Sequence, residues 1–207
     1  MKLYRPVQCT IITQGFGPDK TSPQMLPFYQ SLGLIAHNGV DFGVIPCQTI
    51  DGGIWSKNVI CSPVYWDCDT EGTVYKLSTD VNVGLGVWVN SKDSDGTFKH
   101  RFWHLSQIKC QVGQILGTGD LIGLAGNTGY STGAHLHRDL TPLNEDLTNK
   151  LGNNGYDGCT DPAPYFESIF VLDKIKYMQD TISNLQQQIS IIQKILNLIK
   201  LLNPFKK

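Results

Sequence analysis

The alternation of hydrophobic and polar residues along the first four-fifths of the chain predicts a series of short β-strands. Such runs, separated by Gly, Asn, Asp and Pro, fall at Val7–Thr13, Gly72–Leu77, Leu85–Asn90 and Thr97–His104. The stretch between the last two runs ends in Asp95-Gly96, which predicts a hairpin. Glycines punctuate residues 113–123 in the same rhythm. We therefore expect a mainly β fold, an antiparallel sheet or barrel-like core, over residues 1–165.

The pattern changes after Pro164, where a helical repeat replaces the strand pattern. Residues 169–202 contain neither Gly nor Pro, and apolar residues recur at alternating steps of three and four. The a positions of this heptad repeat are Ile175, Ile182, Ile189 and Leu196, and the d positions are Met178, Leu185, Ile192 and Ile199. Such a repeat predicts a coiled coil, and its isoleucine-rich layers favour three or more strands over two. We assign residues 166–207 to a C-terminal amphipathic helix that forms a homo-oligomer, a trimer or higher, through residues 171–203.

Two other interpretations of the helix stay open at this point. An amphipathic helix can also pack back on its own β domain. The last turns, residues 195–202, are apolar nearly all round, which predicts that they are buried in a larger assembly or against a membrane.

Charge excludes one class of function and divides the chain in two. The 17 basic and 18 acidic residues give a net charge of −1, so the chain lacks the basic excess of a nucleic-acid binder and we expect no direct nucleic-acid recognition. Residues 1–170 carry a net charge of −5 and residues 171–207 carry +4. An acidic β domain is therefore joined to a basic helix.

Cysteine usage and the N-terminus bear on the compartment. None of the 6 cysteines forms a C-x-x-C pair, which argues against a thiolate zinc finger. The first residues show neither an apolar run nor a cleavage site, so we expect no signal peptide. Without that signal we expect buried free thiols, and Cys61–Cys68 is the favoured pair if a disulfide forms.

Four of the 5 histidines lie in three short contexts that suit a metal site. His37 and Asp41 are four residues apart, and Asn38-Gly39 between them predicts a turn that can bring both side chains to one metal ion. His104 ends an apolar strand. His135 and His137 are two apart on a predicted strand and so project from the same face.

These residues match the needs of hydrolytic zinc chemistry. His37, Asp41 and one member of the His135/His137 pair supply two imidazoles and a carboxylate, which is the donor set of an open zinc site. The other member of the pair and His104 are then available for proton transfer and oxyanion stabilisation. His100 has no such context, and we interpret it as an ordinary hydrogen-bonded histidine.

Three segments taken together resemble the lysostaphin-type (LytM-type) zinc metallopeptidase family. They are His37-x-x-x-Asp41, His104-Leu105-Ser106, and the stretch from Gly126 to His137 that ends in His135-Leu136-His137. The resemblance implies that His37, Asp41 and His137 bind zinc and that His104 and His135 are catalytic. It also implies an antiparallel β core with a groove over the metal and, as the substrate, peptide bonds of bacterial peptidoglycan.

The chain departs from the family pattern at three places. Ala36 stands where a glycine is often found, and Arg138-Asp139 follows the His pair where an aromatic residue and a glutamate are common. Residues 45–71, with Trp55 and Trp66, look like an insertion. These departures bear on the shape of the groove and on bond preference.

We therefore expect a zinc-dependent peptidoglycan endopeptidase. The isoleucine-rich repeat favours a component of a phage tail tip or baseplate, located in the virion tail among other tail proteins, that degrades the host cell wall during DNA entry. The alternatives are a free lysin, a bacterial envelope hydrolase, and a non-catalytic structural or wall-binding tail module.

Overall fold

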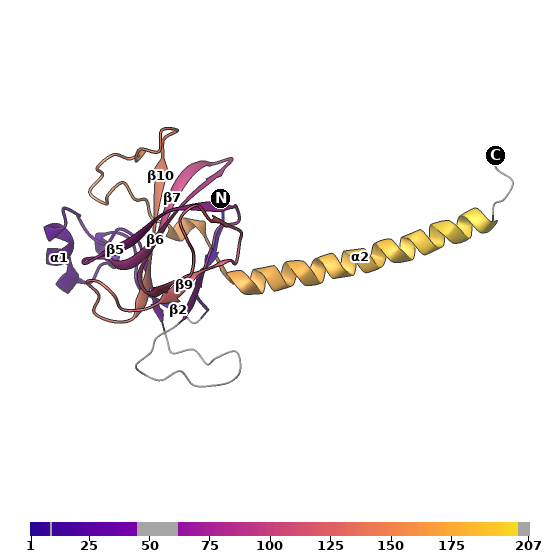
Figure 1. Ribbon diagram of the computed structural model, residues 1–207, viewed down its shortest axis with the longest axis horizontal. Helices are drawn as coiled ribbons and strands as arrows, with labels where there is room; N and C mark the ends of the chain where they lie inside the picture. Colours follow the sequence, from indigo (N-terminus) through magenta and orange to yellow (C-terminus); the bar gives the residue numbers. More distant parts are fainter. Residues whose placement is uncertain (9, 45–61, 203–207) are drawn as a thin grey trace. The chain divides into compact units, whose positions relative to one another are not determined.

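The computed structural model describes residues 1–8, 10–44 and 62–202, which fall into two compact units, Met1–Val171 and Leu172–Lys207 (Figure 1). The strands are β1 (Leu3–Arg5), β2 (Thr10–Gln14), β3 (Val40–Val44), β4 (Pro63–Tyr65), β5 (Gly72–Asp80), β6 (Gly84–Asp93), β7 (Gly96–Ile108), β8 (Ile115–Leu116), β9 (Leu121–Ala125), β10 (His135–Leu143) and β11 (Phe166–Phe170). The helices are α1 (Leu26–Ser31) and α2 (Val171–Leu202), with 3-10 turns at Pro18–Lys20, Pro23–Met25 and Ala163–Tyr165.

Nine strands form one antiparallel sheet, which confirms the expectation of a mainly β, antiparallel fold. The order is β2-β3-β10-β7-β6-β5-β8, and β9 joins β7 on one side and β4 on the other. A separate parallel pair, β1 with β11, completes the strands of the described residues. The predicted hairpin is present, because β6 ends at Asp93 and pairs there with Gly96 at the start of β7.

The strand β10 runs between β3 and β7 and separates the core from the site. Its Leu136, Arg138 and Leu140 are fully buried on one face, and Leu136 and Leu140 belong to the hydrophobic core. His135, His137 and Asp139 alternate with them and therefore lie on the opposite face. The other core residues are aliphatic and aromatic side chains from the same sheet, among them Phe42, Val87, Val89, Phe102 and Leu105.

The core face also holds a buried ion pair. Arg138 donates from Nε to Asp67 Oδ2 and from Nη2 to Asp67 Oδ1, each at 3.0 Å, and neither side chain is exposed. Arg138 Nη2 also lies 2.6 Å from His100 Nδ1, and His100 Nε2 lies 2.7 Å from Ser91 Oγ. A buried charge is tolerated when it is paired and hydrogen-bonded in this way. His100 is thus a hydrogen-bonded histidine of the core, as predicted from the sequence.

The described part of the segment interpreted as an insertion, residues 62–71, contributes to the sheet and the core. β4 pairs with β9 in the main sheet, and Trp66 is a fully buried core residue. Trp66 also donates from Nε1 to the Thr70 carbonyl at 2.7 Å, so its polar atom is satisfied within the fold. Residues 45–61, which include Trp55, lie outside the described residues.

The cysteines that the structure describes carry free thiols. They are Cys68 and Cys159, both buried, and the half-buried Cys110. Cys9, Cys47 and Cys61 lie outside the described residues. The favoured disulfide, Cys61–Cys68, therefore stays a prediction. Burial raises the pKa of the Cys159 thiol to about 12, which keeps this sulfur protonated and unreactive.

The second unit is one continuous helix, as the absence of Gly and Pro predicted. α2 spans Val171–Leu202, and seven of the eight heptad residues leave half or more of their surface exposed in the single chain. A coiled coil is not shown by this one helix. Within the described residues, the helices are too short or too polar to cross a lipid bilayer. The boundary that we place at residue 165, between the β domain and the helical segment, stays a prediction.

Candidate metal centre and active site

His37 and Asp41 approach each other at the start of β3. The chain bends at Gly39, and His37 Nε2 comes within 3.1 Å of Asp41 Oδ1. The other ring nitrogen of His37, Nδ1, lies 2.8 Å from the Gly15 carbonyl oxygen, so it carries the proton and donates it. Glycine at position 39 also lets β10 lie close to this bend. A Cβ there would lie 2.7 Å from His137 Nε2 and from the Arg138 carbonyl oxygen, both of which belong to β10.

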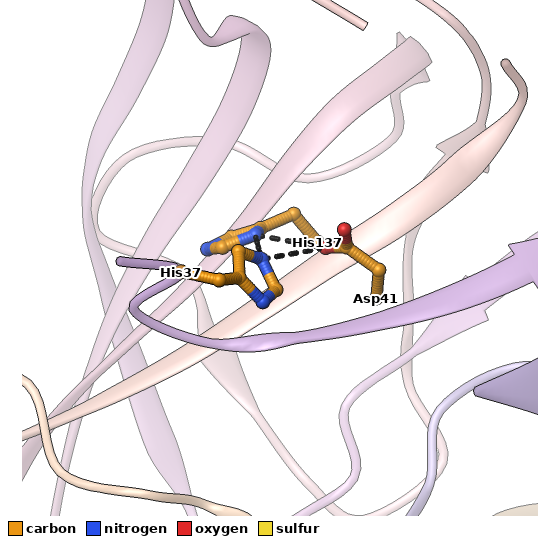
Figure 2. Close-up of side chains that lie close together, drawn as sticks. All are labelled: His37, Asp41 and His137. Carbon is orange, nitrogen blue, oxygen red and sulfur yellow. Dashed lines mark hydrogen bonds and ion pairs between the residues drawn. The ribbon is translucent and has the colours of Figure 1, made fainter. Parts of the chain in front are cut away.

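The pairing of β10 with β3 brings His137 to the same point. His137 and Asp41 are opposite each other in the sheet register. His137 Nδ1 lies 2.9 Å from Asp41 Oδ1 and 2.9 Å from His37 Nε2 (Figure 2). All three residues are buried. The structure thus brings together His37, Asp41 and His137, which are the three ligands that the family resemblance implied.

The three facing atoms are placed to hold one metal ion. His37 uses its proton on Gly15, so the lone pair of Nε2 faces Asp41 and His137. When His137 donates from Nε2 to Asp139, its Nδ1 lone pair points to the same place. In this tautomer two nitrogen lone pairs and a carboxylate oxygen face one point, which is the donor arrangement that binds a metal ion. Ligands at zinc distances of about 2.1 Å in a tetrahedron are separated by roughly 3.3 Å, close to the separations found here.

The pKa values of His137 and Asp41 are both shifted by the charges that meet at this cluster. Burial lowers the pKa of His137, but the carboxylates of Asp139 and Asp41 outweigh burial and raise this pKa to about 9. Burial raises the pKa of Asp41, and the imidazoles of His37 and His137 outweigh it and hold this pKa well below its usual range. A proton therefore occupies the cluster until a metal ion displaces it, so metal affinity falls as pH falls.

His104 reaches the site through a break in the alternation of β7. Trp103 is opposite His137, so strict alternation would turn His104 to the core face that Phe102 occupies. One extra residue in β7 between Phe102 and Leu105 forms a bulge against β6. At the bulge His104 adopts a left-handed backbone with φ 61°. The bulge turns the imidazole to the site face.

The imidazole rings of His104 and His135 lie side by side, and each ring uses Nδ1 to bond a backbone carbonyl oxygen. Their ring centroids are 4.6 Å apart. His104 Nδ1 lies 2.8 Å from the Thr128 carbonyl oxygen and His135 Nδ1 lies 2.7 Å from the Gly133 carbonyl oxygen, so each Nδ1 donates. His135 Nε2 lies 3.7 Å from Asp41 Oδ2. Each histidine therefore keeps Nε2 as its proton-accepting nitrogen, and that of His135 lies beside the candidate metal centre.

The surroundings of His104 keep it uncharged. Burial, then the imidazoles of His137 and His135, lower its pKa to about 4. Its Nε2 therefore carries no proton throughout the neutral range and is available as an acceptor.

A cavity of about 910 Å³ opens over these histidines. One wall is apolar and comes from the α1 region and the loop before β10, where the rings of Phe28 and Tyr130 stack at 3.8 Å. The opposite wall is polar and includes Asn149, Asn153 and Asp157. The volume suits an extended peptide segment.

Three residues around the centre had not been predicted from the sequence as part of the site. Asp139 lies 3.4 Å from His137 Nε2, and Arg101 and Trp103 both donate to Asp139. The available signal was the two-residue period of β10, which places Asp139 on the same face as His135 and His137.

Comparison with known families and structures agrees with this geometry. Residues 68–149 match the family model described as peptidase family M23. A glycyl-glycine endopeptidase, ALE-1 of Staphylococcus capitis, is 34% identical over 87 residues, which cover 42% of this chain and 22% of that protein. The peptidoglycan DD-endopeptidase ShyA of Vibrio cholerae is 35% identical over 104 residues, covering 50% of this chain and 20% of that protein. The chain spans about a fifth of the length of these relatives.

A solved structure shows the same fold. The catalytic domain of lysostaphin from Staphylococcus simulans superposes with a TM-score of 0.52 at 23% identity, covering 75% of this chain and 91% of that domain.

Proposed function

We propose that this chain, whose residues 68–149 match the model of peptidase family M23, is a zinc-dependent endopeptidase that cuts amide bonds in the peptides of bacterial peptidoglycan. One observation carries the proposal: three metal-binding atoms converge beside two histidines that line the same cavity. The two relatives named above are peptidoglycan or glycyl-glycine endopeptidases, which supports the substrate class.

The roles follow from the geometry. We assign His37, Asp41 and His137 as the zinc ligands, because their facing atoms form the donor set of an open site. Zinc bound at such a site lowers the pKa of a bound water to about 7 and polarises a carbonyl oxygen. Of His104 and His135, one accepts the proton of the attacking water and delivers it to the leaving amine as the C–N bond breaks. The other, when it carries a proton on both ring nitrogens, donates a hydrogen bond from Nε2 to the oxyanion.

The test is release of soluble peptides from purified cell walls. We expect release by the full chain, loss on addition of a chelator, recovery with added zinc, and loss in the His135→Ala variant. Mass spectrometry of the new amino termini identifies the bond that is cut. Full activity of His135→Ala, or of the chelated protein, would contradict the proposal. A chain that holds no zinc by elemental analysis supports the non-catalytic alternative.

We also propose that α2 associates with second and third copies of itself. Exposed isoleucine and leucine side chains repeat along one stripe at coiled-coil spacing, and burying them releases water from apolar surface. Ile189 at an a position and Gln187 on the outer face of the same turn give matched variants.

Sedimentation equilibrium of the full chain tests this association. We expect a trimer or larger oligomer for the natural sequence and for Gln187→Asp, and a monomer for Ile189→Asp, because only the latter places a charge in the apolar seam. A monomeric natural chain, or equal behaviour of the two variants, would disprove it.

An oligomeric helix joined to a wall-cutting domain supports a setting in a phage tail tip or baseplate. We propose that the protein resides in the virion tail with other tail proteins and opens the host wall during DNA entry. Labelling of the protein in intact particles by immuno-electron microscopy tests this location. Its absence from purified virions would favour a free lysin or an envelope hydrolase.

A further inference from the structure

Asp139 lies behind the His137 ring, on the side away from the other candidate ligands. We propose that Asp139, fixed in place by Arg101 and Trp103, positions His137 for zinc. The inference rests on the metal site of the proposed function and adds a residue to which no role has been assigned. The contact that motivates it is the 3.4 Å separation between Asp139 Oδ2 and His137 Nε2.

Three donor contacts hold the carboxylate rigidly. Arg101 Nε donates to Asp139 Oδ1 at 2.7 Å and to Oδ2 at 2.9 Å, and Trp103 Nε1 donates to Oδ2 at 3.1 Å. The Asp139 side chain is fully buried. Arg101 is itself fixed from its far side, where Nη1 donates to Asp157 Oδ2 at 2.6 Å. Asp139 therefore has little freedom to move away from the imidazole.

This placement selects one tautomer of His137. A carboxylate accepts a hydrogen bond, so Asp139 favours the form of the ring that carries its proton on Nε2. The lone pair then lies on Nδ1, which faces Asp41 and His37 at 2.9 Å each. Without the acceptor, the ring can rotate or carry its proton on Nδ1, and both changes remove a ligand. Carboxylates that accept from a ligating histidine commonly tune metal affinity in this way.

The chain supplies its own control for a purely structural role. Arg138 and Asp67 form a second buried Arg–Asp pair, on the core face of the same strand, β10. Their partners are core groups such as His100. Asp67→Asn and Asp139→Asn each remove one charge from a buried Arg–Asp pair, but only the second change touches the face of His137.

The experiment measures zinc affinity of the folded full chain by competition with a chromophoric chelator. Thermal unfolding of each metal-free variant is measured alongside to establish that it is folded. We expect Asp139→Asn to bind zinc about 10–100-fold more weakly than the natural sequence. Asp67→Asn should stay within about threefold, because Asp67 does not contact a ligand ring. Asp139→Glu should also recover affinity to within about threefold, since it restores a carboxylate.

A second readout reports the metal environment itself. The visible absorption of the cobalt-substituted protein should shift in Asp139→Asn and stay unchanged in Asp67→Asn. If Asp139→Asn does not fold, Trp103→Phe removes one of the donors to Asp139 without removing a charge and should weaken zinc binding in the same direction.

Two results would overturn the inference: natural zinc affinity in Asp139→Asn, or equal weakening in Asp67→Asn. Zinc affinity and wall hydrolysis are separate measurements. A chain that shows the expected zinc affinities but cuts no cell wall would refute the proposed function and leave the role of Asp139 standing.

Discussion

Replacing His137 by alanine is expected to remove zinc from the protein and to lower wall hydrolysis more than about a thousandfold. His137 Nδ1 faces both Asp41 and His37 at 2.9 Å, so it is the central atom of the donor set. The two groups that remain in the variant are fewer than the three protein ligands of an open zinc site. Elemental analysis and the wall-release assay measure the two effects.

The matched comparison is His135→Ala. His135 comes from the same strand face, but its Nε2 lies 3.7 Å from Asp41 Oδ2 and outside the three-atom cluster. We expect this variant to keep one zinc per chain while it loses activity. Zinc loss in His135→Ala together with zinc retention in His137→Ala would reverse the assignment of ligand and catalytic histidine.

Much of the β domain could be predicted because hydrophobic and polar residues alternate along several of its strands. Strands β5, β6 and β7 and the hairpin at Gly96 correspond to runs that alternate in polarity. The two-residue period also placed His135 and His137 on one face. A turn at Asn38-Gly39 was enough to expect His37 and Asp41 together. These features depend on residues close in sequence, which local patterns describe well.

The features that the sequence did not predict depend on contacts between distant residues. The bulge at His104 is set by the register of β7 against β6, and alternation alone places this histidine in the core. Residues 45–71 look like an insertion in the sequence, and the burial of Trp66 in the core could not be read from that pattern because it depends on packing against distant strands. The helix shows the opposite case. Its repeat is visible in the sequence, and the single helix leaves the apolar side chains of that repeat exposed.

Replacing His104 by asparagine is expected to leave zinc content unchanged and to lower wall hydrolysis by about 10²–10⁴-fold, the usual contribution of a general acid or base. Asparagine is the suitable substitution because His104 has φ 61°, and asparagine tolerates this left-handed backbone better than alanine does. The amide can donate and accept hydrogen bonds, as the imidazole does. It cannot take up a proton, so the variant isolates proton transfer.

The pH profile separates His104 from the rest of the site. Because burial and the neighbouring imidazoles lower its pKa to about 4, His104 is uncharged at neutral pH and loses its accepting nitrogen only as the pH falls toward that value. The loss of activity in His104→Asn should therefore be the same at pH 6 as at pH 8. A defect confined to acidic pH would indicate that His104 acts while protonated. An active variant would leave His135 as the sole proton-transfer residue.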